Sequence, residues 1–158
     1  MRKSIIVLCL AVVMLLAFTA AALAMPAGWN MVAGETTTGT GLYYFGLDDN
    51  MYTVVDESAT VPGRGYWVHP TEAVQETLPD VPLPISVDLD AGWNLVGNSA
   101  SVPATAQGVT FFAYNAITGM YDVAFELAPG RGAWVRSEVA TTITFVPVAV
   151  SSNGIPSQ

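Results

Sequence analysis

The sequence predicts an all-β fold made of two tandem repeats, and three observations lead to that prediction. After residue 24, short runs of Val, Thr, Tyr, Trp and Ile alternate with Gly, Pro, Asn and Asp, as in strands joined by tight turns. No segment there has apolar residues at sustained three- and four-residue intervals, the pattern of an amphipathic helix. Two motifs each occur twice, 64 and 67 residues apart, and the hairpin between them recurs after 69 residues, which indicates a duplicated unit. We therefore expect two pseudo-symmetric antiparallel repeats, sandwich or barrel-like, that share one core and follow a signal-peptide helix.

The N-terminal segment has the three parts of a secretory signal. Arg2 and Lys3 are followed by an apolar run over residues 5–16, and Ala22-Leu23-Ala24 supplies a small-x-small cleavage pattern. We therefore expect residues 1–24 to be a signal peptide that is removed after Ala24. The apolar stretch over residues 4–25 is also long enough to cross a bilayer, so an uncleaved anchor remains the alternative. The predicted repeats then cover residues 25–83 and 84–158.

The first strand of each repeat carries the motif Ala-Gly-Trp-Asn-x-Val, at residues 27–32 and 91–96. A glycine before the strand indicates a positive φ or close approach of another backbone. Neighbouring residues of a strand face opposite sides. We therefore expect the tryptophan in the core and the asparagine side chain in a hydrogen bond to the backbone of a nearby loop. The residues concerned are Gly28, Trp29 and Asn30, and Gly92, Trp93 and Asn94.

An aromatic hairpin follows in each repeat. Residues 42–45 and 51–55 flank a turn rich in Gly, Asp and Asn, and residues 110–114 and 120–125 flank a second turn that ends in Gly119. In this alignment residues 43–45 of the first copy match residues 112–114 of the second.

The motif Pro-Gly-Arg-Gly precedes the next strand, at residues 62–65 and 129–132. Proline followed by glycine is typical of a type II turn, with the positive φ at Gly63 and Gly130. We expect Trp67 and Trp134 of the following strands to lie in the core. Arg64 and Arg131 are expected to stack on a tryptophan or to pair with a carboxylate, the alternative being that they bind a carboxylate or sugar acid.

A last strand is expected at residues 77–82 and again at 142–147. The alternating segment 85–89 leads into the second repeat, whereas the signal peptide occupies the matching position before Trp29. We therefore expect the C-terminal residues 145–150 to pack beside the first repeat and close its sheet.

Composition excludes several function classes. The only cysteine, Cys9, lies in the leader, so the mature chain has no disulfide, thiolate or cysteine-ligated metal. Thirteen acidic residues face three arginines after the leader, which argues against nucleic acid and against anionic membrane surfaces. The chain after the leader also has no lysine to protect the edges of its sheets.

Few residues carry recognisable chemistry. His69 is the only histidine, Asp48-Asp49-Asn50 lacks the rest of a calcium loop, and Asp88 and Asp90 fit an alternating strand. No catalytic triad or phosphate loop is present. We expect no enzyme, no metal and no cofactor, and we take Tyr43, Tyr44 and Tyr66 as the candidates for an exposed contact surface.

Gly-Trp-Asn-Leu-Val-Gly at 92–97, the aromatic hairpin and Pro-Gly-Arg-Gly-Tyr-Trp-Val at 62–68 together resemble an all-β tandem repeat of secreted prokaryotic surface proteins. The resemblance covers the whole mature chain and implies a structural or interaction role. We expect a secreted, non-enzymatic structural or adhesive protein of the cell surface or an extracellular assembly. Its partners would be copies of itself, with growth into a fibre, or other extracellular proteins. A carbohydrate-binding module is the alternative, and a carboxylate-based enzyme is the third reading.

Overall fold

The computed structural model describes residues 21–34, 43–49, 51–79 and 81–149. This part of the chain is all-β, with four antiparallel sheets, as the sequence predicts. Its one helical element is a single 3₁₀ turn, η1 (Glu57–Ala59). Residues 1–20 of the predicted signal-peptide helix lie outside the described residues, and the last three residues of that prediction, Ala22 to Ala24, lie in a strand.

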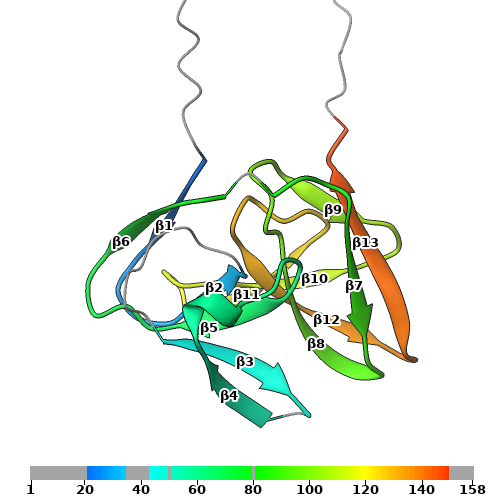
Figure 1. Cartoon of the computed structure of the whole chain (residues 1–158), viewed down its shortest axis with the longest axis horizontal. Helices are drawn as coiled ribbons and strands as arrows, with labels where there is room; N and C mark the ends of the chain where they lie inside the picture. Colours follow the sequence, from blue (N-terminus) through cyan, green and yellow to red (C-terminus); the bar gives the residue numbers. More distant parts are fainter. Residues whose placement is uncertain (1–20, 35–42, 50, 80, 150–158) are drawn as a thin grey trace, which may run out of the picture.

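Two four-stranded sheets form the body of the molecule (Figure 1). One has the order β2-β5-β3-β4 and the other β8-β12-β10-β11. In both sheets the neighbouring strands are therefore the first, fourth, second and third of that sheet in chain order. The first comprises β2 (Asn30–Ala33), β3 (Tyr44–Asp48), β4 (Met51–Val55) and β5 (Gly65–Val68). The second comprises β8 (Gly92–Gly97), β10 (Phe111–Asn115), β11 (Met120–Ala124) and β12 (Gly132–Ser137).

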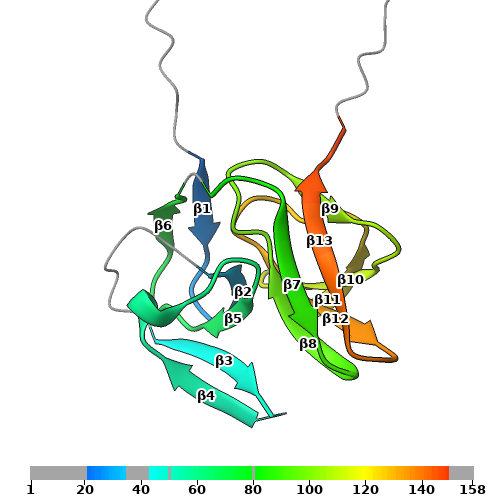
Figure 2. The ribbon, with the colours of Figure 1, turned by 45° about the vertical axis from the view of Figure 1, so that its right-hand side comes forward.

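Two smaller sheets complete the fold and lie apart from each other (Figure 2). One pairs β1 (Ala22–Met25) with β6 (Val74–Thr77). The other has the order β7-β13-β9, from β7 (Ile85–Leu89), β13 (Thr141–Pro147) and β9 (Ala104–Ala106).

The prediction that the C-terminal strand closes the sheet of the first repeat is wrong. Residues 145–147 belong to β13, which pairs with β7 and β9 and not with the first half of the chain. The lead-in strand before Trp29 is instead β1, because Leu23 and Met25 alternate with exposed alanines and give this segment one apolar face. This strand was not predicted from the sequence because the same residues match the end of a signal peptide. Val150 lies outside the described residues.

The prediction of one shared core is also wrong. Buried apolar side chains form two clusters, one from each half of the chain, and each fills the space between a four-stranded sheet and its smaller sheet. In the second cluster the rings of Phe111 and Phe145 stack at 5.8 Å between centroids. The first cluster consists of Leu23, Met25, Val32, Tyr44, Tyr66, Val68 and Leu78.

The two Pro-Gly-Arg-Gly turns join the halves by reciprocal insertion. Gly63 and Gly130 have φ of +81° and +72°, which confirms the left-handed position expected in these turns. A Cβ on Gly63 would lie 2.3 Å from Val87 of the other half, and a Cβ on Gly130 would lie 2.7 Å from Leu78. Each turn also accepts a backbone hydrogen bond across the junction, from Gly97 N–H to Gly63 O at 2.9 Å and from Ala33 N–H to Gly130 O at 2.8 Å.

The hairpins align differently from the sequence prediction. Phe45 stands opposite Trp67, and Phe112 stands opposite Trp134, so these two phenylalanines hold matching positions. The alignment of residues 43–45 with 112–114 is therefore wrong by two residues. The reason is turn length, since β4 begins three residues after β3 ends whereas β11 begins five residues after β10 ends.

The inserted turns give a test of the junction between the halves. Gly63→Ala should lower the free energy of unfolding by about 3 kcal/mol, because the methyl group meets Val87 and the residue keeps a positive φ. Gly108→Ala is the matched control, since Gly108 has φ +71° but open space around it, and it should cost only about 1 kcal/mol. Urea unfolding followed by tryptophan fluorescence measures both. Equal losses would show that the close packing at Gly63 contributes nothing.

Candidate functional site

The tryptophans of the repeated motifs lie at the surface, contrary to the prediction that they form the core. Trp29 and Trp93 are 46% and 47% exposed, and Trp67 and Trp134 are partly buried. The physical reason is strand alternation: in β5, Tyr66 and Val68 point into the core, so Trp67 between them points out of the other face of the sheet.

A first groove of about 420 Å³ lies on that outer face. Trp29 contacts Phe45 and Trp67 edge-to-face, with ring centroids 5.7 and 6.1 Å apart. Trp67 also contacts Tyr114 from the other half at 5.0 Å, and its indole N–H donates to the Tyr52 hydroxyl at 3.1 Å. The groove is lined by Trp29, Phe45, Tyr52, Trp67 and Tyr114.

A second groove of about 540 Å³ is built in the same way around the tryptophans of the second half, with Leu47 and Tyr52 contributed by the first half. Trp93 contacts Phe112 at 5.5 Å and Trp134 at 6.4 Å between ring centroids. Tyr52 lines both grooves, so they join into one aromatic surface. The described residues that line it carry no charge. The second groove is lined by Leu47, Tyr52, Trp93, Phe112, Tyr121 and Trp134.

This aromatic surface, defined by the residues of the two grooves, can contact a partner through apolar ring faces and a few phenol and indole donors. Sequence reasoning did not single out Tyr52, Tyr114 or Tyr121. The signal was available in Met51-Tyr52 and Met120-Tyr121, because the same dipeptide opens the outer strand of each hairpin.

Of the three tyrosines predicted as contact residues, only Tyr43 is exposed. Tyr44 and Tyr66 are buried in the first core, where their rings meet edge-to-face at 6.0 Å. The Tyr66 hydroxyl accepts a hydrogen bond from the Val61 N–H at 2.9 Å. Burial raises the pKa of this phenol. These two side chains are therefore part of the core and offer almost no exposed surface.

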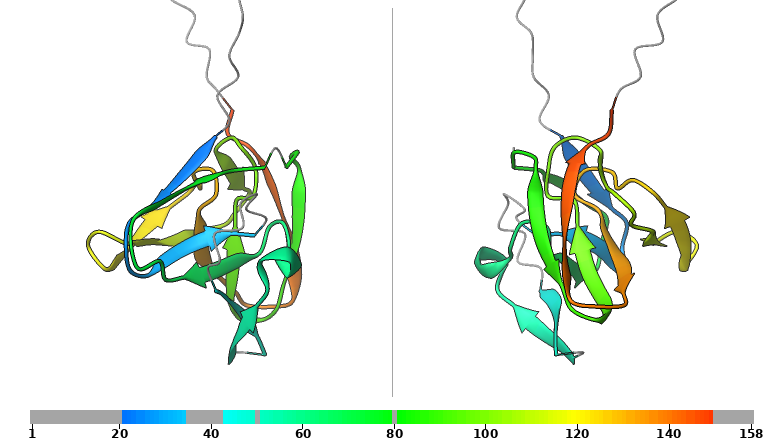
Figure 3. Two further views of the ribbon diagram at one scale, coloured as in Figure 1. Left: turned by 60° about the vertical axis from the view of Figure 1, so that its left-hand side comes forward. Right: turned by 90° about the vertical axis from the view of Figure 1, so that its right-hand side faces the viewer.

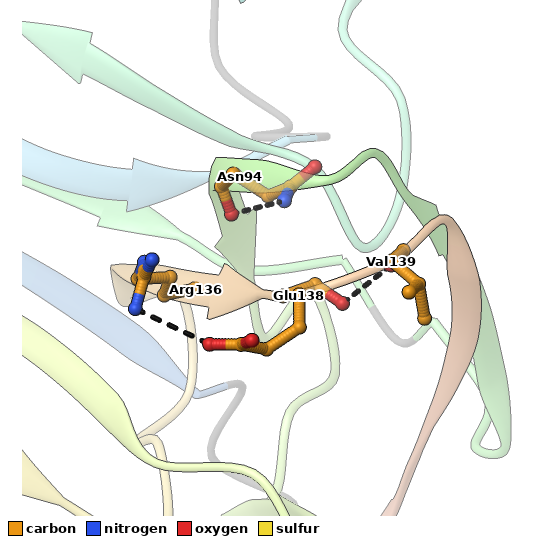
Figure 4. Close-up of polar contacts among 6 residues, drawn as sticks. Asn94, Arg136, Glu138 and Val139 are labelled. Atoms are coloured by element: carbon orange, nitrogen blue, oxygen red, sulfur yellow. Dashed lines mark hydrogen bonds and ion pairs between the residues drawn. The ribbon is translucent and has the colours of Figure 1, made fainter.

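The asparagines behave as predicted. Asn94 is buried, its amide donates to the carbonyls of Asp90 and Gly92, and its Oδ1 accepts from the Asp90 N–H at 2.9 Å. Figure 4 shows Asn94 with one of its hydrogen bonds. Asn30 donates in the same way to Pro26 and Gly28. Pro26 has no N–H, so Asn30 Oδ1 is buried without a hydrogen-bond donor among the described residues. Gly28 and Gly92, in the loops that the asparagines close, have φ of +100° and +106°.

Within the part of the chain that the structure describes, Arg64 and Arg131 neither stack on a tryptophan nor pair with a carboxylate, contrary to the prediction. Arg131 donates from Nη2 to the Ala24 carbonyl at 3.0 Å, and burial lowers the pKa of its guanidinium. The ion pair formed among the described residues is Arg136–Glu138, at 3.4 Å on the surface (Figure 4). What Arg64 and Arg131 share is a backbone role, since they form isolated bridges to Val96 and Val32 across the junction.

The other candidate groups lie apart. The His69 ring packs against Trp29 at 4.8 Å between centroids, and Asp88 points outward and accepts from Thr142 at 2.7 Å. Asp48 and Asp49 end the β3 strand and begin its turn, while Asn50 lies outside the described residues. Across residues 21–149, gaps excepted, no three His, Cys, Asp or Glu side chains are grouped so that they could hold a metal ion. The same residues include no helix of the length and hydropathy needed to span a bilayer.

The difference between the two asparagines can be tested. Pro26→Ala supplies the N–H that Asn30 Oδ1 lacks, and should raise the free energy of unfolding by about 1 kcal/mol, after the added flexibility of the unfolded chain is subtracted. Urea unfolding of the protein measures the change. The same substitution in an Asn30→Ala background is the control and should give no gain. A gain that persists there would show that another contact is responsible.

Comparison with known proteins gave no match: no family model, curated protein or solved structure matches the chain.

Proposed function

We propose that this protein is an exported, non-enzymatic structural or adhesive protein, built from two tandem pseudo-symmetric repeats, that associates with copies of itself. The repeated motifs and the identical strand order of the two four-stranded sheets support the repeats. Self-association is inferred from the outer strands β4 and β11, which have an open edge. In the described part of the chain each is paired on one side only.

These two edge strands are apolar and exposed. Met51, Tyr52 and Val54 on β4, and Met120, Tyr121 and Val123 on β11, are between 50% and 66% exposed. Asp122 is the only charged residue on either strand. Soluble proteins usually protect such edges with lysine, proline or a covering element, because a free edge pairs readily with another chain.

Two such edges in one molecule allow each copy to pair with two other copies. Both hairpins stand out from the body of the molecule (Figure 3). Pairing of β4 of one copy with β11 of the next is a head-to-tail contact, and contacts of this kind continue into rings or filaments. The aromatic surface borders both edges through Tyr52 and Tyr121, so it adds side-chain burial to the backbone pairing.

The edge-pairing proposal predicts association that depends on concentration. Sedimentation velocity of the exported protein should show species larger than the monomer, and electron microscopy should show filaments or rings. Val54→Lys combined with Val123→Lys should shift the protein to monomer, because each lysine places a charge on a pairing edge.

The matched control adds the same charge elsewhere. Val139 is as exposed as Val54 but lies in the loop between β12 and β13, so Val139→Lys should leave the association unchanged. A protein that stays monomeric at high concentration, or an equal effect of all three lysines, would contradict edge pairing.

Carbohydrate binding is the second candidate, and the exposure of Trp29 and Trp93 favours it. Exposed indole rings are suited to stack on the flat apolar faces of pyranose sugars. The excess of carboxylates on this chain would repel acidic polysaccharides, so a neutral glycan is the expected ligand.

Glycan binding is tested by titrating the protein with cellohexaose while following tryptophan fluorescence. If the aromatic surface is the site, Trp93→Ala should weaken binding at least about tenfold, which corresponds to about 1.4 kcal/mol. Phe125→Ala, which removes a still more exposed ring that lines neither groove, is the control and should bind normally. A spectrum unchanged by cellohexaose would remove this glycan as a ligand.

A further inference from the structure

Strand β1 occupies the position where the sequence predicts the end of the signal peptide. Leu23 is 2% exposed and Met25 is 1% exposed, and both belong to the first core. Cleavage after Ala24 would leave Met25 but remove Leu23, together with most of the strand.

The backbone of this strand also makes hydrogen bonds to the rest of the molecule. Ala22, Leu23, Ala24 and Met25 pair in register with Thr77, Glu76, Gln75 and Val74 of β6. The Leu78 N–H donates to the Ala21 carbonyl at 2.8 Å. The Ala24 carbonyl accepts from Arg131 of the second half.

Leu23 also takes part in the junction between the halves. A Cβ on Gly130 would lie 3.2 Å from Leu23 Cδ2 and still closer to Leu78, so both leucines pack directly on the inserted turn. In the second half the corresponding contact joins Gly63 to Ile85 and Val87 on β7, the strand that precedes Trp93. Without Leu23, one of the two inserted turns would lose part of the surface that it packs against.

We propose that the mature chain keeps Leu23, and that the leader is cut between Ala22 and Leu23. This inference rests on the proposed export of the protein. Ala20 and Ala22 supply a small-x-small pattern two residues upstream of the one that sequence reasoning selected. Hydrolysis of this peptide bond consumes one water and leaves a carboxylate on Ala22 and an α-ammonium on Leu23. Leu23, Ala24 and Met25 then remain paired with β6, whereas the pair of Ala22 with Thr77 and the hydrogen bond from the Leu78 N–H to the Ala21 carbonyl are lost with the leader.

The direct test is the N-terminus of the exported protein. The full chain is expressed in a secreting bacterial host, and the extracellular fraction is analysed by Edman sequencing and intact mass. The expected first residue is Leu23. A first residue of Met25, or an exported chain with its leader intact, would overturn the proposed cut. A chain that stays inside the cell would instead refute export, and the cut-site proposal with it.

A pair of variants on the exposed side of β1 separates the two cleavage patterns. Ala24→Gln blocks a cut after residue 24, but should leave processing at Leu23 unchanged, because the side chain points to solvent. Ala22→Gln is the control, because it places glutamine directly before the proposed cut. The peptidase should not cleave there, so the leader should be retained. Retention of the leader in Ala24→Gln would contradict the proposal.

Thermal stability gives an independent readout. If Leu23 is part of the mature core, Leu23→Ala should lower the Tm of the exported protein by roughly 10 °C. If the leader is removed after Ala24, the exported proteins with and without this substitution are identical and melt together. Equal Tm values would therefore overturn the proposal even if the N-terminus were blocked to sequencing.

Discussion

The fold depends on the reciprocal insertion of two glycine turns. Gly63 and Gly130 each place a left-handed backbone against the apolar side chains of the opposite half, at distances that leave no room for a Cβ. Two backbone hydrogen bonds, from Gly97 and Ala33, hold the turns in place. Because each half fills a gap in the other, two units of a size at which a single core is marginal stabilise one another while keeping separate cores.

The same insertion explains why the aromatic rings are at the surface. Beside the turns the two sheets approach so closely that Gly65 and Gly132 face the backbone of Val96 and Val32. The tryptophans lie on this same outer face of the sheets, where ring-lined grooves remain open. Tyr114 reaches Trp67 across the junction, so the aromatic surface exists only when both halves are assembled. The aromatic surface therefore depends on the integrity of the fold.

Most of the local structure could be predicted from the sequence. Most strand positions, the positive φ of Gly63 and Gly130, and the hydrogen bonds of Asn30 and Asn94 to loop carbonyls follow from short-range rules. The strand predicted at residues 77–82 is instead β6, at Val74–Thr77, and β9 at Ala104–Ala106 was not predicted. The hairpin alignment failed because the turns differ in length. The first strand was missed because Ala22-Leu23-Ala24 satisfies two patterns at once, a cleavage site and a half-buried strand.

The sequence by itself determined that the described part of the chain is all-β, which residues make most of its turns, and which residues alternate along each strand. Only the tertiary structure decided which face of each strand is covered. Period-two alternation separates Trp67 from Tyr66 and Val68, but all three are large or apolar, so hydrophobicity does not tell inside from outside. That choice was made by the packing of β1 and β6 against one face and by the close approach of the other half on the opposite face.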